Sequence, residues 1–189
     1  MPESSAHALN AKIRVRWVEK IMRSRNMEIL AIQTLRNSVM AASFMASTAI
    51  LLIIGALNIS EKIGQWAIHW HPYGMALPFS TELWQIKLIC LLLDFFIAFY
   101  CFSMAIRFFN HVGYMINLQS ESSFEESLQK QTCAFLNRAG NYYSFSTRMF
   151  FFSLPIILWF FGPYFLLLGT FTLIAVLTML DKVPKAEDC

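Results

Sequence analysis

The sequence is poor in charge: Asp, Glu, Lys and Arg make up only 14% of its 189 residues, against roughly 25% in an average soluble domain. Hydrophobic residues make up 57%, and phenylalanine alone occurs 18 times. A soluble domain of this size could not bury so much apolar surface, because small domains have a large surface relative to their volume. The composition therefore predicts an integral membrane protein, organised as one membrane domain over residues 1–189.

Motifs that mark enzymes, metal sites and secreted proteins are also missing. No C-x-x-C spacing occurs among the four cysteines, so neither a zinc site nor a disulfide framework is indicated. The histidines fall in loops and no nucleophile elbow is present, which argues against a hydrolytic triad. The chain begins polar and then basic, unlike a signal peptide. We therefore expect no enzymatic activity, no cofactor and no metal.

Four hydrophobic segments are predicted to cross the bilayer as helices. They cover about residues 37–57, 86–108, 144–161 and 163–180, and a span needs about 20 apolar residues. The last two come from one long apolar run, divided at Gly162-Pro163 because that pair is a strong break signal; a re-entrant pair is the alternative. The predicted fold class is an all-α helical membrane bundle.

The distribution of positive charge predicts the orientation of the spans. Thirteen Lys and Arg residues lie in the N-terminal region, the loop between the second and third spans and the C-terminal tail, against two in the loop after the first span. The positive-inside rule then puts both termini in the cytoplasm. The aromatic residues Trp66, Trp70, Tyr73 and Trp84 of the outer loop are typical of an interfacial belt.

Residues 1–36 are predicted to contain a cationic amphipathic helix. Ile13, Trp17 and Ile21 form an apolar stripe beside a row of Lys and Arg, which is typical of a helix lying in the membrane plane. A helix that runs on into the first span, partly packed against other protein, is the alternative. The cluster of basic residues is interpreted as contact with anionic headgroups rather than with nucleic acid. A second, short surface helix is expected before the third span.

Asp94 is the residue of greatest chemical interest, because it lies inside the second span. An ionised carboxylate there costs on the order of 3 kcal/mol, so it should be neutral or paired. By depth in the bilayer, four hydroxyl residues are predicted to form a polar layer around it: Thr48, Ser153, Thr170 and Thr172. This layer would either carry a proton or ion, or hold the helices together through hydrogen bonds.

Three further groups of residues have both a functional and an ordinary explanation. Ser38, Ala42 and Ala46 recur every four positions and favour close helix contact, within the chain or with a neighbour. Arg107, Arg138 and Arg148 could bind lipid headgroups near the inner face, or simply anchor the protein there. His69 and His71 are two apart in the outer loop, but a metal usually needs three or four ligands, so an interfacial loop is favoured.

Several stretches resemble the membrane protein family known as domain of unknown function 599, found in bacteria and plants. They are LAIQTLRNSVMAASFMASTAI (Leu30–Ile50), AIRFFNHV (Ala105–Val112), FLNRAGNYYSFSTRMFFFSLP (Phe135–Pro155) and LWFFGPYF (Leu158–Phe165). The resemblance implies an integral membrane protein without an established activity, cofactor or catalytic set, located in the inner (plasma) membrane of a bacterium. Members commonly begin with a further span, which residues 1–36 lack, and Asp94 is not part of the family's pattern.

Three functional hypotheses remain open. The first is a non-enzymatic membrane protein that acts through helix–helix contact, as a homo-oligomer or as a partner of other membrane subunits. The second is a small oligomeric transporter or channel with Asp94 in its path. The third, a membrane enzyme acting on lipids, has only the inner arginines and scattered histidines in its favour.

Overall fold

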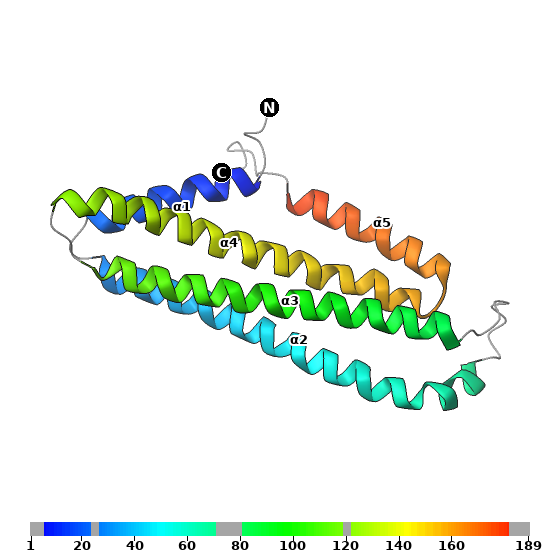
Figure 1. Ribbon diagram of the computed structural model, residues 1–189. Helices are drawn as coiled ribbons and strands as arrows, with labels where there is room; N and C mark the ends of the chain where they lie inside the picture. Colours follow the sequence, from blue (N-terminus) through cyan, green and yellow to red (C-terminus); the bar gives the residue numbers. More distant parts are fainter. Residues whose placement is uncertain (1–5, 24–26, 71–80, 119–121, 182–189) are drawn as a thin grey trace.

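The chain folds into long α-helices, as the sequence predicts. A computed structural model describes residues 6–23, 27–70, 81–118 and 122–181. In these residues there are five helices and no strand: α1 (Ala6–Arg23), α2 (Glu28–Trp70), α3 (Thr81–Ile116), α4 (Ser122–Trp159) and α5 (Pro163–Leu180). The all-α fold class is therefore confirmed, and Figure 1 shows the helices side by side in an elongated bundle.

Three of the helices are much longer than the spans predicted from hydropathy. α2, α3 and α4 contain 43, 36 and 38 residues, or about 64, 54 and 57 Å at 1.5 Å per residue, whereas a hydrocarbon core is about 30 Å thick. Two segments, Glu28–Ser60 and Glu82–Ile116, are long and apolar enough to cross a membrane, and Pro163–Met179 is a shorter apolar helix. The short surface helix expected before the third span is instead the first half of α4.

The break predicted at Gly162-Pro163 is present and joins α4 to α5. Gly162 has φ 146°, a backbone conformation that residues with a Cβ rarely adopt, and Pro163 begins α5. α5 returns beside α4 (Figure 1), and its end is tied back by a 2.7 Å ion pair between Arg148 and Asp181. α4 continues through Pro155. A Cβ on Gly169 would lie 3.3 Å from the Pro155 Cα, so glycine allows the two helices to approach closely.

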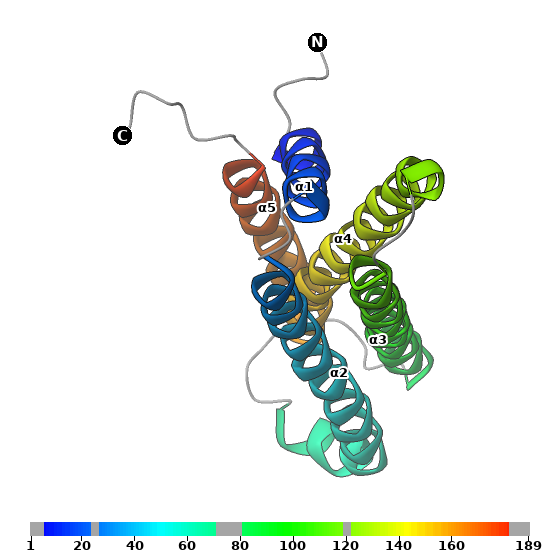
Figure 2. The same cartoon turned by 90° about the vertical axis from the view of Figure 1, so that its left-hand side faces the viewer.

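The helices are arranged around α3 and α4. α3 packs along both α2 and α4, while α1 and α5 each pack on α4. Figures 1 and 2 show α1 and α5 on the same side of the bundle, one after the other along α4, with α2 and α3 opposite. α1 therefore packs along α4, as the alternative allowed. It is nevertheless a separate helix: α1 ends at Arg23 and α2 begins at Glu28.

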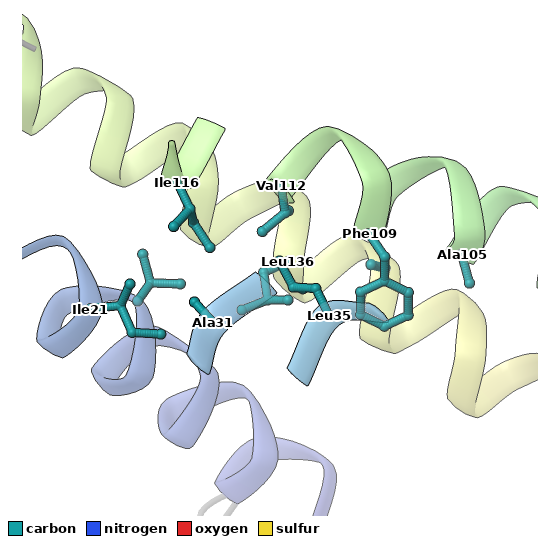
Figure 3. Packing of buried hydrophobic residues seen from close by; sticks show 10 residues of the cluster. Ile21, Ala31, Leu35, Ala105, Phe109, Val112, Ile116 and Leu136 are labelled. Carbon is teal, nitrogen blue, oxygen red and sulfur yellow. The ribbon is translucent and has the colours of Figure 1, made fainter. Parts of the chain in front are cut away.

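The end of the bundle beside α1 has its own hydrophobic core. Val18 and Ile21 of α1 are buried there, whereas Ile13, from the same predicted stripe, is 53% exposed. Figure 3 shows side chains of α1, α2, α3 and α4 converging at this point. The remaining buried members of this head cluster are Ala31, Leu35, Ala105, Phe109, Val112, Ile116, Leu136 and Ala139. Two further clusters, around Phe102 and around Phe95, continue the core along the bundle.

Candidate functional site

Asp94 is buried inside the bundle, with only 5% of its surface exposed. It lies on α3 between Leu91 and Phe95, both buried members of an apolar cluster. Among the described residues its Oδ2 atom has no hydrogen-bond partner. A polar atom in that condition costs free energy on the order of 1–3 kcal/mol, and more when charged. Burial among apolar side chains therefore disfavours the ionised form of this carboxyl group.

The hydroxyl residues predicted to surround Asp94 are not gathered into one layer. Ser153 is 3% exposed, but its Oγ donates to the Phe150 carbonyl of its own helix, at 2.7 Å. Thr48, Thr170 and Thr172 likewise donate to carbonyl oxygens one turn earlier in their helices. Thr48 and Thr172 are exposed and Thr170 is half-buried. Of the four, only Ser153 shares the buried interior with Asp94.

The pairing of α3 with α4 brings Asp94 and Ser153 to similar depth. Phe95 contacts Phe150 with ring centroids 5.9 Å apart. Asp94 precedes Phe95 by one residue and Ser153 follows Phe150 by three. Because α3 and α4 run in opposite directions (Figure 1), both polar residues lie on the same side of this aromatic contact, within about one helical turn of each other along the bundle. They are two of the few buried polar groups in an interface that is otherwise apolar.

Lys87 is a further polar residue of this interface, although its position in the sequence predicts only a charge of the outer loop. It is 8% exposed, and its Nζ donates a 2.9 Å hydrogen bond to the Trp159 carbonyl and lies 5.2 Å from the centroid of that ring. Lys87 precedes Asp94 by seven residues, which places both on one face of α3, about 10 Å apart along the axis. That spacing was the signal available in the sequence. The distance is too long for a direct ion pair.

The small residues of α2 predicted to make a helix contact do so within the chain. Ala42 and Ala46 are buried and pack against Phe102 of α3. Ser38 is half-buried, and its hydroxyl donates to the Thr34 carbonyl of the same helix. Small side chains at this spacing allow α2 and α3 to lie close together, so this stripe is already occupied by an internal partner.

The three arginines predicted to bind headgroups do not form one pocket. Arg148 pairs with Asp181, and Arg107 is exposed on α3. Arg138 lies over the Phe108 ring, 5.7 Å from its centroid, and lines a shallow groove of about 340 Å³ between α3 and α4. Of the three arginines, Arg138 is the one that lines this groove.

Arg14 holds α1 against α4. Its Nε donates to Asn137 Oδ1 at 3.0 Å, and its Nη2 to Asn141 Oδ1 at 3.4 Å. A Cβ on Gly140 would overlap the guanidinium group, so a residue without a side chain creates the notch that accepts Arg14. Burial lowers the pKa of Arg14 from its ordinary value, but a guanidinium stays charged in proteins. Both of these acceptors are neutral amides, so neither of them neutralises the charge.

The predictions for the outer loop lie outside the described side chains. These are His69, His71 and the aromatic residues Trp66, Trp70 and Tyr73. Trp84 is described and makes an edge-on contact with Phe160, with ring centroids 4.6 Å apart. Among the described residues, no group of three or more His, Cys, Asp or Glu is placed to hold a metal ion.

The fold and the site define an all-α protein with helices apolar enough to suggest membrane association and a buried carboxyl group between two of them. In comparisons with known proteins, the chain matches the family described as "Protein of unknown function, DUF599" over residues 1–186. It belongs to that family, and the resemblance drawn from the sequence is confirmed. The match includes the N-terminal segment that lacks a span. No curated protein and no solved structure matched the chain.

Proposed function

We propose that the protein crosses the bilayer four times and acts, without enzymatic activity, by pairing with a second copy of itself through α2. The apolar segments of α2 and α3 support the first two crossings. The α4–α5 hairpin supplies the other two, with Gly162 on the outer side and the head cluster projecting into the cytoplasm. The excess of Lys and Arg on the side of the termini supports that direction.

The observation that carries the pairing proposal is a second line of small residues, on the outward side of α2. Ala41 and Thr48 are exposed, and a Cβ on Gly55 would meet no atom within 4 Å. These residues are seven apart, so they lie on one face of the helix. Small residues let membrane helices approach closely. The inward stripe at Ala42 and Ala46 is used by α3, which leaves this line free for a partner.

The exposure of α2 also favours a partner on that side. In the most apolar 18-residue stretch of α2 only 22% is buried inside the bundle, against 39% in the corresponding stretch of α3. Lipid would cover the large exposed side chains Phe44 and Leu51 well, whereas a line of small residues offers it less surface to contact. A second copy is the occupant proposed, because two identical lines of small residues can face each other about a two-fold axis.

Counting subunits in lipid tests the pairing. The protein is labelled with one fluorophore per chain, reconstituted at low density in vesicles and scored by single-molecule photobleaching. We expect two bleaching steps for the native chain. Thr48→Leu places a large side chain on the line of small residues, so it should bleach mostly in one step. Ser47→Leu is the matched control, since Ser47 is also exposed but points about 100° away. A native chain that bleaches in one step, or pairs only with a different subunit, would contradict the proposal.

Orientation is tested by labelling Cys189 in intact cells with a membrane-impermeant maleimide. The proposal expects no labelling until the membrane is opened. Labelling of Cys189 from outside would reverse the predicted direction of all four spans.

A second candidate function is a proton or cation step at Asp94, and one observation favours it: the buried Oδ2 atom without a partner. Intramembrane carboxyl groups commonly mark ion or proton pathways. Ser153 and Lys87 lie on the same side of Asp94 along the α3–α4 interface, so polar groups extend from it toward the turn between α4 and α5. One subunit encloses little space, and conduction would therefore use the paired form.

A flux measurement separates this candidate from a structural role for Asp94. Liposomes containing the protein and a pH-sensitive dye are given a proton gradient, with Asp94→Asn and Ser153→Ala compared against the native chain. A native flux that Asp94→Asn abolishes without changing thermal stability would support the proton step. A native chain that leaks no faster than empty liposomes would remove it.

A further inference from the structure

A groove between α3 and α4 has a positively charged side chain in its lining. It has a volume of about 340 Å³ and is lined by Cys101, Arg138, Asn141, Tyr142 and Phe145. That volume falls at the lower end of the range for ligand pockets, about 300–1,000 Å³. No carboxylate is among these lining residues, so nothing in the groove itself neutralises Arg138.

The groove changes from polar to apolar along the bundle axis. Arg138 and Asn141 lie in the part of α4 that precedes the predicted third span, while Phe145 and Cys101 lie within the third and second spans. Seven residues, or about 10 Å, separate Arg138 from Phe145. The polar end therefore sits at the inner membrane surface, and the apolar end sits at the depth of the hydrocarbon.

A second positive charge borders the polar end. Asn141 lines the groove and also accepts the 3.4 Å hydrogen bond from Arg14 Nη2. In the part of the chain that the structure describes, Arg14 donates to two neutral amides, so its charge and that of Arg138 both lie beside Asn141. Partial burial of Arg14 strengthens its interaction with a nearby anion, because the surrounding water is reduced.

The remaining predicted arginines lack these features. Arg148 is neutralised by Asp181, and Arg107 does not line the groove. The ring of Phe108 holds the Arg138 guanidinium in a cation–π contact, which fixes its position at the groove mouth.

We propose that this groove binds one acidic phospholipid of the inner leaflet, with its phosphate between Arg138 and Arg14 and an acyl chain along Cys101 and Phe145. A headgroup phosphate accepts hydrogen bonds from a guanidinium in bidentate geometry, and Asn141 and Tyr142 offer further polar contacts. The proposal uses the membrane placement given above and does not depend on pairing through α2.

Lipid-dependent thermal stability in mild detergent tests the site. Purified protein is titrated with phosphatidylglycerol, with phosphatidylcholine of the same chains, and with inorganic phosphate. A ligand that binds the folded state raises the melting temperature in proportion to its saturation. We expect phosphatidylglycerol to stabilise the native chain well below the concentration at which phosphatidylcholine does, and inorganic phosphate alone to have no effect. Equal stabilisation by free phosphate would identify an anion site instead of a lipid site.

Matched variants locate the binding. Arg138→Gln should weaken phosphatidylglycerol binding about tenfold, whereas Arg107→Gln, an exposed arginine at similar depth, should leave it unchanged. Arg138→Lys, which keeps the charge, should recover part of the affinity and guards against a folding defect. Phe145→Ser should weaken long-chain but not short-chain lipid. Equal losses for Arg138→Gln and Arg107→Gln, or no preference for the acidic lipid, would overturn the site while leaving pairing and membrane insertion untouched.

Discussion

The ammonium group of Lys87 in α3 donates a 2.9 Å hydrogen bond to the carbonyl oxygen of Trp159, the last residue of α4. The same oxygen accepts a 3.2 Å bond from the Gly162 amide. A cation beside the final carbonyls of a helix interacts favourably with the negative end of its dipole. The contact therefore fastens α3 to the turn at which α4 gives way to α5.

Reversing the charge of Lys87 should destabilise the turn between α4 and α5. Lys87→Glu brings a carboxylate against carbonyl oxygens in a buried position, and we expect it to lower the free energy of unfolding by about 3 kcal/mol or more. Lys87→Met should change it by less than about 1 kcal/mol, because the lost hydrogen bond is offset by the lost desolvation cost. Chemical denaturation in detergent measures both. Gln85→Glu, on an exposed position nearby, is the control and should have little effect.

Replacing Asp94 by an apolar residue should stabilise the protein. Asp94→Leu removes a buried oxygen that lacks a partner, and we expect a gain of about 1–3 kcal/mol. Ser153→Ala removes a hydroxyl that has its partner, so it should be neutral or cost up to about 1 kcal/mol. Chemical denaturation in detergent measures the change in stability for both variants. A loss of stability in Asp94→Leu would mean that the carboxyl group makes a contact that holds the helices together.

The notch at Gly140 predicts that the effect of Gly140→Ala on stability changes sign when Arg14 is also replaced. Gly140→Ala should displace the Arg14 guanidinium and cost about 1–3 kcal/mol of α1 docking, despite the better helix propensity of alanine. In an Arg14→Ala background the clash is absent, and Gly140→Ala should instead stabilise by up to about 1 kcal/mol. Limited proteolysis between α1 and α2 reports the docking.

Gly113→Ala controls for helix propensity, since its Cβ would lie at an ordinary 3.9 Å from Leu35 Cδ1. It should be neutral or stabilising in both backgrounds. If Gly140→Ala costs the same stability with and without Arg14, the two substitutions are independent and the notch does not hold α1.

The reactivity of Cys133 should depend on Glu19. Burial raises the pKa of the Cys133 thiol, and the negative charge of Glu19 raises it further. Because the thiolate is the reactive form, alkylation by iodoacetamide at pH 8 should be slower than that of a free thiol. Glu19→Gln should move the pH–rate midpoint downward and speed the reaction, while Glu126→Gln should not. Mass spectrometry of the modified peptide follows the rate, and a Glu19→Gln profile that matches the native one would contradict the contact.

The helices and the break at Gly162-Pro163 could be predicted from sequence because hydropathy and turn residues are local signals. The angular position of a side chain could not be predicted from depth alone. Thr48 was grouped with Asp94 by depth, but it lies about 100° around α2 from its buried neighbour Ala49. That angle is decided by which face packs on α3.

Contacts between distant segments were beyond a local reading of the sequence. Arg14 and Asn137 are 123 residues apart, and neither residue type in isolation indicates a notch. Lys87 was counted as an outer-loop charge, although its spacing from Asp94 placed both on one helix face. Its burial against Trp159 follows from the packing of α4, which hydropathy does not report.

Disulfide trapping in native membranes tests pairing through α2 most directly. Thr48→Cys and Ile54→Cys are each introduced into a chain whose own cysteines are replaced by alanine, and membranes are oxidised with copper phenanthroline. Ile54 is 50% exposed but lies about 120° around the helix from Thr48. The account predicts a cross-linked dimer for Thr48→Cys and little or none for Ile54→Cys. Equal cross-linking at both positions, or none at Thr48→Cys, would contradict it.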